Sequence, residues 1–192
     1  GVQVVALQDT VRSLWLNNRD EVLTNVSVRQ ALRDAVEWDT VYDYLRSVGE
    51  IPAAGYIAPA AVTEKGEPYR REGESPAFDT NVPQAQTELG AGLTALYPDK
   101  KSPALPSLTV LAAEDETSAN LARYLIQSWQ KNLHLKCTLT LVREEQLLSR
   151  LKSGKYQAAI VTVTADGLSG SENLRAYRST AAGNYSGYQS AG

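Results

Sequence analysis

The sequence predicts an α/β protein with a mostly parallel sheet and flanking helices. The main observation is the alternation of strand-like and helix-like segments between residues 108 and 164, an order typical of parallel sheets covered by helices. The composition is that of an ordinary globular protein, with 43% hydrophobic and 21% charged residues. A length of 192 residues allows one domain with a substantial core. We therefore expect residues 1–192 to form a single α/β lobe.

The chain opens with two strand-like segments, residues 2–7 and 11–16, which are rich in Val and Leu. After a short polar stretch, Ser27 is expected to cap a helix that runs to about Trp38. The apolar residues of this helix recur at helical spacing: Val28, Ala31, Leu32 and Ala35.

A second helix is expected from about Asp39 to Val48, capped by Asp39 or Thr40 and ended by Gly49. Pro and Gly residues punctuate residues 51–59, which predicts a loop laid across the surface. Residues 63–77 are the most polar stretch of the chain and predict an exposed excursion.

A third helix should follow a cap at Asp79 or Thr80, with two glycines, Gly90 and Gly92, weakening it. Its inward positions are Ala85, Leu89 and Leu93. The remaining strands are expected at residues 108–112, 135–142 and 156–164, and the remaining helices at residues 118–130 and 144–151.

Cys137 is the only cysteine and His134 the only histidine, so no internal disulfide and no cysteine-based metal site can form. Both lie in an alternating segment, residues 133–141, in which His134 should point outward. The same alternation puts Cys137 on a buried face with Leu135, Leu139 and Leu141. We expect a core thiol, a surface imidazole, no metal site and no cofactor.

The net charge is −3 and no basic run occurs, so the sequence does not predict nucleic-acid binding. The longest apolar runs are too short to cross a membrane, and no signal-peptide pattern opens the chain. Because Gly1 leads directly into strand-like sequence and methionine is absent, we expect a piece excised from a longer protein. Any membrane attachment would then depend on an anchor elsewhere in that protein.

Several segments resemble, in the same order, the signatures of one family. Residues 14–18 (Leu-Trp-Leu-Asn-Asn) and 28–32 (Val-Arg-Gln-Ala-Leu) resemble its strand–loop–helix signature. Residues 151–156 resemble its Leu-x-x-Gly-x-Tyr-Asp turn, residues 162–166 its Gly-Trp-x-Ala-Asp strand end, and residues 184–188 its Asn-x-x-Gly-Tyr loop. The family is the oligopeptide/dipeptide-binding group of extracellular solute-binding proteins, the receptors of ABC importers.

The resemblance implies that the chain is the C-terminal lobe of a periplasmic-binding-protein-like, or Venus flytrap, fold. It implies that a peptide or small-molecule ligand binds in the cleft between this lobe and an absent N-terminal lobe of the same chain, and that the two lobes close by a hinge motion. It further implies delivery to an ABC transporter permease, and a lipoprotein at the extracellular face of the membrane or in the periplasm.

The resemblance also implies a ligand site at the end of the last strand. Asp166 matches the aspartate that pairs with the ligand's α-amino group in peptide-binding members. The segment before it would hydrogen-bond the backbone of an extended peptide: Thr162, Val163, Thr164 and Ala165. Val163 stands where the family usually has an aromatic residue. The alternative role for Asp166, close to Ser171 and Glu172, is that of a helix-capping or loop carboxylate.

We therefore expect solute capture, most simply of peptides, for an ABC importer. The alternative is a lobe of the same fold that senses a ligand within an intracellular regulator. Catalysis is not expected, because residues 167–170 (Gly-Leu-Ser-Gly) lack the nucleophile-elbow pattern and His134 would face outward. Neither a phosphate-binding loop nor a complete dinucleotide fingerprint is present.

Overall fold

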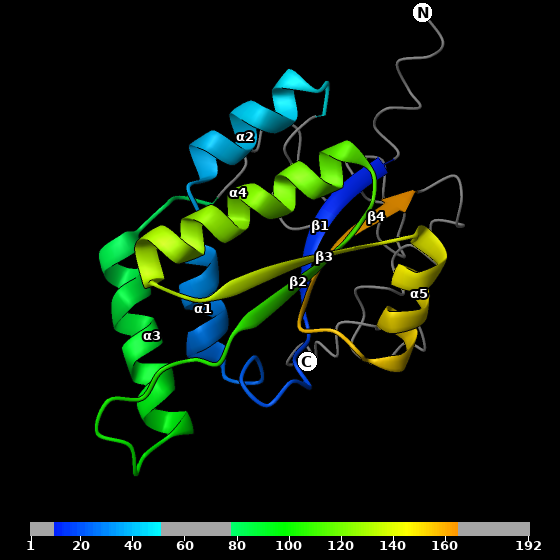
Figure 1. Cartoon of the computed structure of the whole chain (residues 1–192). Helices are drawn as coiled ribbons and strands as arrows, with labels where there is room; N and C mark the ends of the chain where they lie inside the picture. Colours follow the sequence, from blue (N-terminus) through cyan, green and yellow to red (C-terminus); the bar gives the residue numbers. More distant parts are fainter. Residues whose placement is uncertain (1–9, 51–77, 165–192) are drawn as a thin grey trace, which may run out of the picture.

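The alternating segments form one sheet. The structure, a computed structural model, describes residues 10–50 and 78–164, and these contain a four-stranded sheet in the order β1-β4-β2-β3 (Figure 1). Its strands are β1 (Thr10–Leu16), β2 (Leu108–Ala113), β3 (Cys137–Val142) and β4 (Ala158–Thr164). Strand β2 runs parallel to both β3 and β4, and β1 runs antiparallel to β4. The predicted mostly parallel α/β sheet is confirmed.

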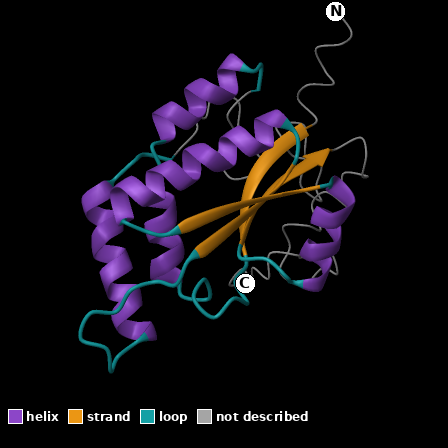
Figure 2. Cartoon of the chain, viewed as in Figure 1, coloured by secondary structure: helices purple, strands orange, loops and turns teal. Residues whose placement is uncertain are grey.

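Two helices connect the parallel strands and lie on opposite faces of the sheet. Helix α4 (Glu116–Leu133) joins β2 to β3, and helix α5 (Glu144–Ser153) returns across β2 to β4. The two connections run in opposite directions across the sheet, and since each is expected to be right-handed, they occupy opposite faces (Figure 2). The loops leaving β2 and β3 therefore turn to opposite faces, an arrangement that often marks the ligand-binding edge of an open α/β sheet.

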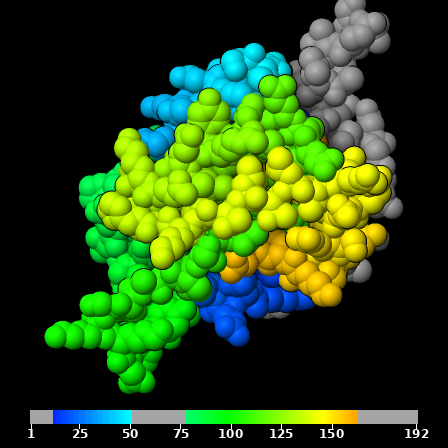
Figure 3. All heavy atoms as spheres, in the orientation of Figure 1, coloured from blue at the N-terminus to red at the C-terminus, as the bar shows by residue number. Residues whose placement is uncertain are grey.

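The two faces carry cores of different size. On the α4 face, helices α1 (Val26–Asp34), α2 (Trp38–Ser47) and α3 (Val82–Leu96) add a large apolar cluster around the fully buried Trp129, whose indole N–H donates to the Leu32 carbonyl at 2.8 Å. On the other face, α5 buries a smaller cluster: Trp15, Leu111, Val142, Leu147, Leu151, Tyr156, Ala159 and Val161. The loop after α3 projects away from this body (Figure 3).

Helix α1 begins at a different cap from the predicted one. Asn25, not Ser27, caps it by accepting a hydrogen bond from the Val28 backbone N–H at 3.1 Å. Helix α3 packs directly on this end: a Cβ at Gly92 would lie 2.7 Å from Val28 Cγ2 and 3.0 Å from Asn25 Oδ1. Gly92 is therefore required by the close approach of the two helices, and does not merely weaken α3.

Helix α3, in contrast, is capped one or two residues later than predicted. The Asn81 side chain accepts from the Gln84 backbone N–H at 3.1 Å and caps the helix. Thr80 does not cap the helix but bonds to the junction between α1 and α2. Its hydroxyl donates to the Val36 carbonyl at 2.6 Å and accepts from the Trp38 backbone N–H at 3.0 Å. The helix start is therefore set by the junction between α1 and α2, which spacing alone does not reveal.

The other element boundaries differ by a few residues. Asp39 and Thr40, the predicted caps of α2, lie in its first turn, and Gly49 follows its end with φ of 83°. His134 is exposed as predicted, but it ends α4 in the left-handed conformation, φ 55°, so β3 starts only at Cys137.

The buried face predicted for β3 is only partly correct. Leu135 is buried and Cys137 is half-buried, and burial raises the pKa of the Cys137 thiol to about 11. Leu141 is 37% exposed, because β3 is the edge strand of the described sheet. The predicted strand at residues 2–7, the loops at residues 51–59 and 63–77, and everything after Thr164 lie outside the described residues.

Candidate functional site at the carboxyl edge of the sheet

The predicted ligand-binding segment ends strand β4. Thr162 is exposed and lies opposite Arg12 in the β1–β4 ladder, and the next two residues, Val163 and Thr164, continue that ladder. Asp166 and Ala165 lie outside the described residues. The described part of the predicted site is therefore the carboxyl end of β4.

Strand β4 is paired unevenly along its two sides. Strand β1 pairs with its whole length, from Ala158 to Thr164. The ladder with β2 joins only Val110 to Ala158 and Leu111 to Ala159. Within the described residues, no strand pairs with residues 161–164 on the side away from β1. Their backbone groups on that side are therefore available, as far as the described chain goes, to an added strand.

Arg12 joins four segments at this edge. Its Nε donates to Glu50 Oε1, beyond α2, at 2.7 Å. Its Nη1 donates to three further acceptors: Ser118 Oγ at 2.6 Å, Thr162 Oγ1 at 3.1 Å and Asp115 Oδ1 at 3.2 Å. The Arg12 side chain is 15% exposed, so these charge-assisted bonds are partly shielded from water. We call this set of residues the Arg12 network.

Asp115 takes part in two interactions at once. The carboxylate oxygen that accepts from Arg12 also accepts from the Ser118 backbone N–H at 2.9 Å, which caps α4. The negative charge also lies at the N-terminal end of the helix dipole, where it is favourable. The start of α4 and the end of β4 are therefore held by the same pair of charges.

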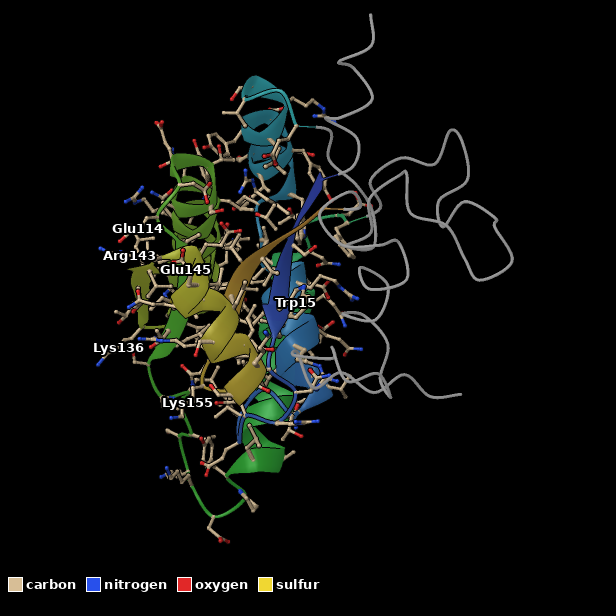
Figure 4. All side chains as sticks on the ribbon, turned by 90° about the vertical axis from the view of Figure 1, so that its right-hand side faces the viewer. Trp15, Glu114, Lys136, Arg143, Glu145 and Lys155 are labelled. Carbon is tan, nitrogen blue, oxygen red and sulfur yellow. The ribbon has the colours of Figure 1, made fainter. Side chains whose placement is uncertain are left out.

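The carboxyl edge is acidic overall. Helices α4 and α5 both begin here, and acidic residues occupy their first turns. The acidic side chains of the edge are Glu50, Glu114, Asp115, Glu116, Glu144 and Glu145, with Arg12 and Arg143 as the basic ones. In Figure 4, Glu114, Arg143 and Glu145 lie near one another, while Lys136 and Lys155 lie toward the other end. Such an edge favours a cationic group over an anion.

The opposite, amino end of the sheet is held by neutral groups. The Asn17 amide is 5% exposed and donates from Nδ2 to the Tyr156 carbonyl at 2.8 Å and the Gly154 carbonyl at 3.1 Å. Its backbone N–H donates to the Gln157 carbonyl at 2.8 Å. Asn17, a motif residue of the Leu-x-Asn-Asn segment, thus fastens the turn after β1 to the turn before β4.

An open pocket of about 660 Å³ lies at this amino end. Its lining is charged in both senses, with Arg19, Arg150 and Lys155 beside Asp20 and Glu21. Burial raises the pKa of the Tyr156 phenol, which also lines the pocket, and nearby Arg19 opposes the shift. Thr162, the first residue predicted for the ligand site, is not among the described residues that line this pocket.

Neither a metal centre nor a membrane span is found in the described part of the chain. Among residues 10–50 and 78–164, no group of His, Cys, Asp and Glu side chains is arranged to hold a metal ion. No helix among them is long and apolar enough to cross a membrane.

Sequence reasoning missed Arg12, Glu50 and Ser118. The one local signal is an arginine within a strand of otherwise uncharged residues, Thr10–Leu16, because a charged residue there needs partners. Its partners lie 38 to 150 residues away along the chain, and no spacing rule identifies them.

Comparison with known proteins identifies a family whose model matches most of the chain. Residues 3–185 match the family described as bacterial extracellular solute-binding proteins, family 5, middle. A search of curated proteins found no match. The fold is similar to that of OppA from Listeria monocytogenes bound to peptide, with a TM-score of 0.76, 19% identity, and coverage of 96% of this chain and 36% of that one.

Two further solved structures are similar. OppA from Burkholderia pseudomallei gives a TM-score of 0.74 at 20% identity, over 95% of this chain and 35% of that one. A peptide-binding protein of a peptide ABC transporter gives 0.74 at 18% identity, over 95% of this chain and 80% of that one. The chain therefore spans about a third of the length of the two OppA proteins.

Proposed function

Because the chain belongs to family 5 of the bacterial extracellular solute-binding proteins, we propose that it forms one lobe of a receptor that captures peptides for an ABC importer. The ligand would lie between this lobe and a second lobe outside these 192 residues. The observation that carries the proposal is the end of β4, which lies at an acidic edge and has one side unpaired among the described strands. Asp166 follows this end by two positions in the sequence.

The proposed mechanism separates affinity from selectivity. An extended peptide adds as a strand beside residues 161–164 and exchanges backbone hydrogen bonds, which do not depend on its side chains. Asp166 accepts a charge-assisted hydrogen bond from the peptide's amino terminus, worth about 1.5–3 kcal/mol. Closure of the second lobe removes water and strengthens this pair. Such a receptor would accept many peptide sequences that carry a free amino terminus.

The relatives support a peptide ligand. The Listeria OppA structure contains a bound peptide, and OppA from Haemophilus influenzae was solved in complex with the peptide RPPGFSPFR. The family name describes extracellular proteins, and on that ground we place the full protein at the outer face of the membrane or in the periplasm.

The test is ligand retention by the full-length protein. The protein is purified and gently denatured, and released molecules are identified by mass spectrometry. We expect a ladder of peptides with free amino termini. Asp166→Asn, which keeps the shape of the side chain, should weaken peptide binding about tenfold, since it removes one charge-assisted bond.

The matched control is Asp99→Asn, an exposed aspartate in the loop after α3. It should leave peptide binding unchanged. Release of a single non-peptide solute would contradict the peptide proposal, and equal binding by the Asp166→Asn variant would assign that carboxylate a structural role.

A further inference from the structure

We propose that Arg12 is a positioning residue for the peptide site, holding the end of β4 and the chain at Glu50 in fixed places against the start of α4. This role rests on the function proposed above. It is distinct from ligand contact, because Arg12 acts through the residues that it holds.

The geometry of the Arg12 network supports this role. Arg12 lies directly opposite Thr162 in the ladder, and the two side chains are hydrogen-bonded at 3.1 Å. The same guanidinium reaches Ser118, which is 1% exposed, at 2.6 Å. The end of β4 is thereby connected through one side chain to a buried position of α4.

The network also connects the segment after α2 to this edge. Glu50, three residues beyond the end of α2, accepts from Arg12 Nε at 2.7 Å. Thr162 precedes Asp166 by only four positions. Among the described strands, β1 alone pairs with β4 beyond Ala159. The position of the β4 end therefore depends strongly on β1 and on Arg12.

Charge explains why an arginine is needed. Glu50 and Asp115 are 30% and 48% exposed and both accept from the one guanidinium. Without it, the Glu50 and Asp115 carboxylates would lose the cation that they share, and their mutual repulsion would loosen the segments at this edge. A lysine supplies charge from a single nitrogen and cannot reproduce bonds from both Nε and Nη1.

The experiment uses the full-length protein with Arg12→Met and Arg12→Lys. Equilibrium dialysis measures binding of a random pentapeptide pool with free amino termini and of the same pool after N-acetylation. Arg12→Met should lower binding of the free pool about tenfold and should reduce the preference for free over acetylated peptides, because a misplaced Asp166 no longer selects the ammonium group. Arg12→Lys should fall between Arg12→Met and the wild type.

The matched control is Asn17→Ala, which weakens the other end of the sheet. It should lower the melting temperature yet leave both binding and the amino-terminal preference unchanged. Hydrogen exchange of the Thr162 and Thr164 amides should rise in Arg12→Met and not in Asn17→Ala.

The outcomes are distinguishable. If Arg12→Met binds the free pool and rejects the acetylated pool as the wild type does, Arg12 serves stability alone and the positioning role is wrong. If the wild-type protein retains neither pool, the peptide function itself fails and the role of Arg12 fails with it.

Discussion

The two ends of the sheet are held together in contrasting ways. At the amino end, one buried neutral amide, Asn17, fastens two turns through backbone carbonyls. At the carboxyl end, the Arg12 guanidinium donates hydrogen bonds to two carboxylates and two hydroxyls. Neutral buried bonds are insensitive to salt, whereas ion pairs at a partly exposed edge are screened and adjustable. The difference predicts that stability depends more on the amino end, and that salt acts mainly on the carboxyl end, where ligand binding is proposed.

The helices reinforce this contrast. Helices α4 and α5 begin at the carboxyl end with acidic first turns and finish at the amino end with basic last turns. Each arrangement complements the helix dipole. The result is a lobe that is acidic where the ammonium group of a peptide is proposed to bind and has its basic residues Arg150 and Lys152 at the far end.

The largest expected effect is at the amino end. Asn17→Ala leaves the Gly154 and Tyr156 carbonyls without their buried donor, and we expect a loss of about 2–4 kcal/mol in the free energy of unfolding. Urea unfolding measures it. Asn18→Ala, the adjacent motif residue, is the control and should be nearly neutral; similar losses in both variants would contradict the special role of Asn17.

A smaller effect appears at alkaline pH, again at the amino end. Tyr156 is 8% exposed, and burial raises its pKa above the usual 10.0, so the folded protein keeps a proton that the unfolded chain releases. Stability should therefore fall as the pH rises above 10, by about 1–2 kcal/mol at pH 11. Tyr156→Phe should lose less stability over this range in urea unfolding. Parallel pH curves for the two proteins would contradict the expectation.

The smallest effects belong to the carboxyl end. Asp115→Ala removes both the α4 cap and a partner of Arg12, and we expect a loss of about 1 kcal/mol. Asp115→Asn keeps a capping oxygen and should lose only about 0.3 kcal/mol. That smaller loss should vanish in high salt, measured by urea unfolding because urea is uncharged. A loss in Asp115→Asn that does not depend on salt would contradict the expected difference in salt sensitivity between the two ends.

The sequence predicted the sheet well because its signals are local. The strand–helix–strand alternation after residue 108 and the apolar spacing of α1 and α4 do not depend on distant partners, and these elements are confirmed. Helix starts were less predictable. Several capping residues compete at each start, and tertiary contacts decide among them, as with Thr80, which serves the α1–α2 junction while Asn81 caps α3.

The candidate site was only partly predictable. Family motifs pointed to residues 162–166, and the structure places the described ones at the carboxyl edge. The Arg12 network and the short β2–β4 ladder could not be inferred, because both depend on which strands become neighbours and for how long. The roles of Asp166 and Ala165 stay predictions.

The half-buried thiol of Cys137 has a practical consequence for testing the proposed lobe closure. With a pKa of about 11 it forms almost no thiolate at neutral pH, so maleimide reagents should modify it slowly. These 192 residues contain no other cysteine. A cysteine introduced at the exposed Lys155 could then be labelled selectively within this lobe. Paired with a dye on the proposed second lobe, it would report the proposed opening and closing as a change in energy transfer between the two dyes of a single molecule.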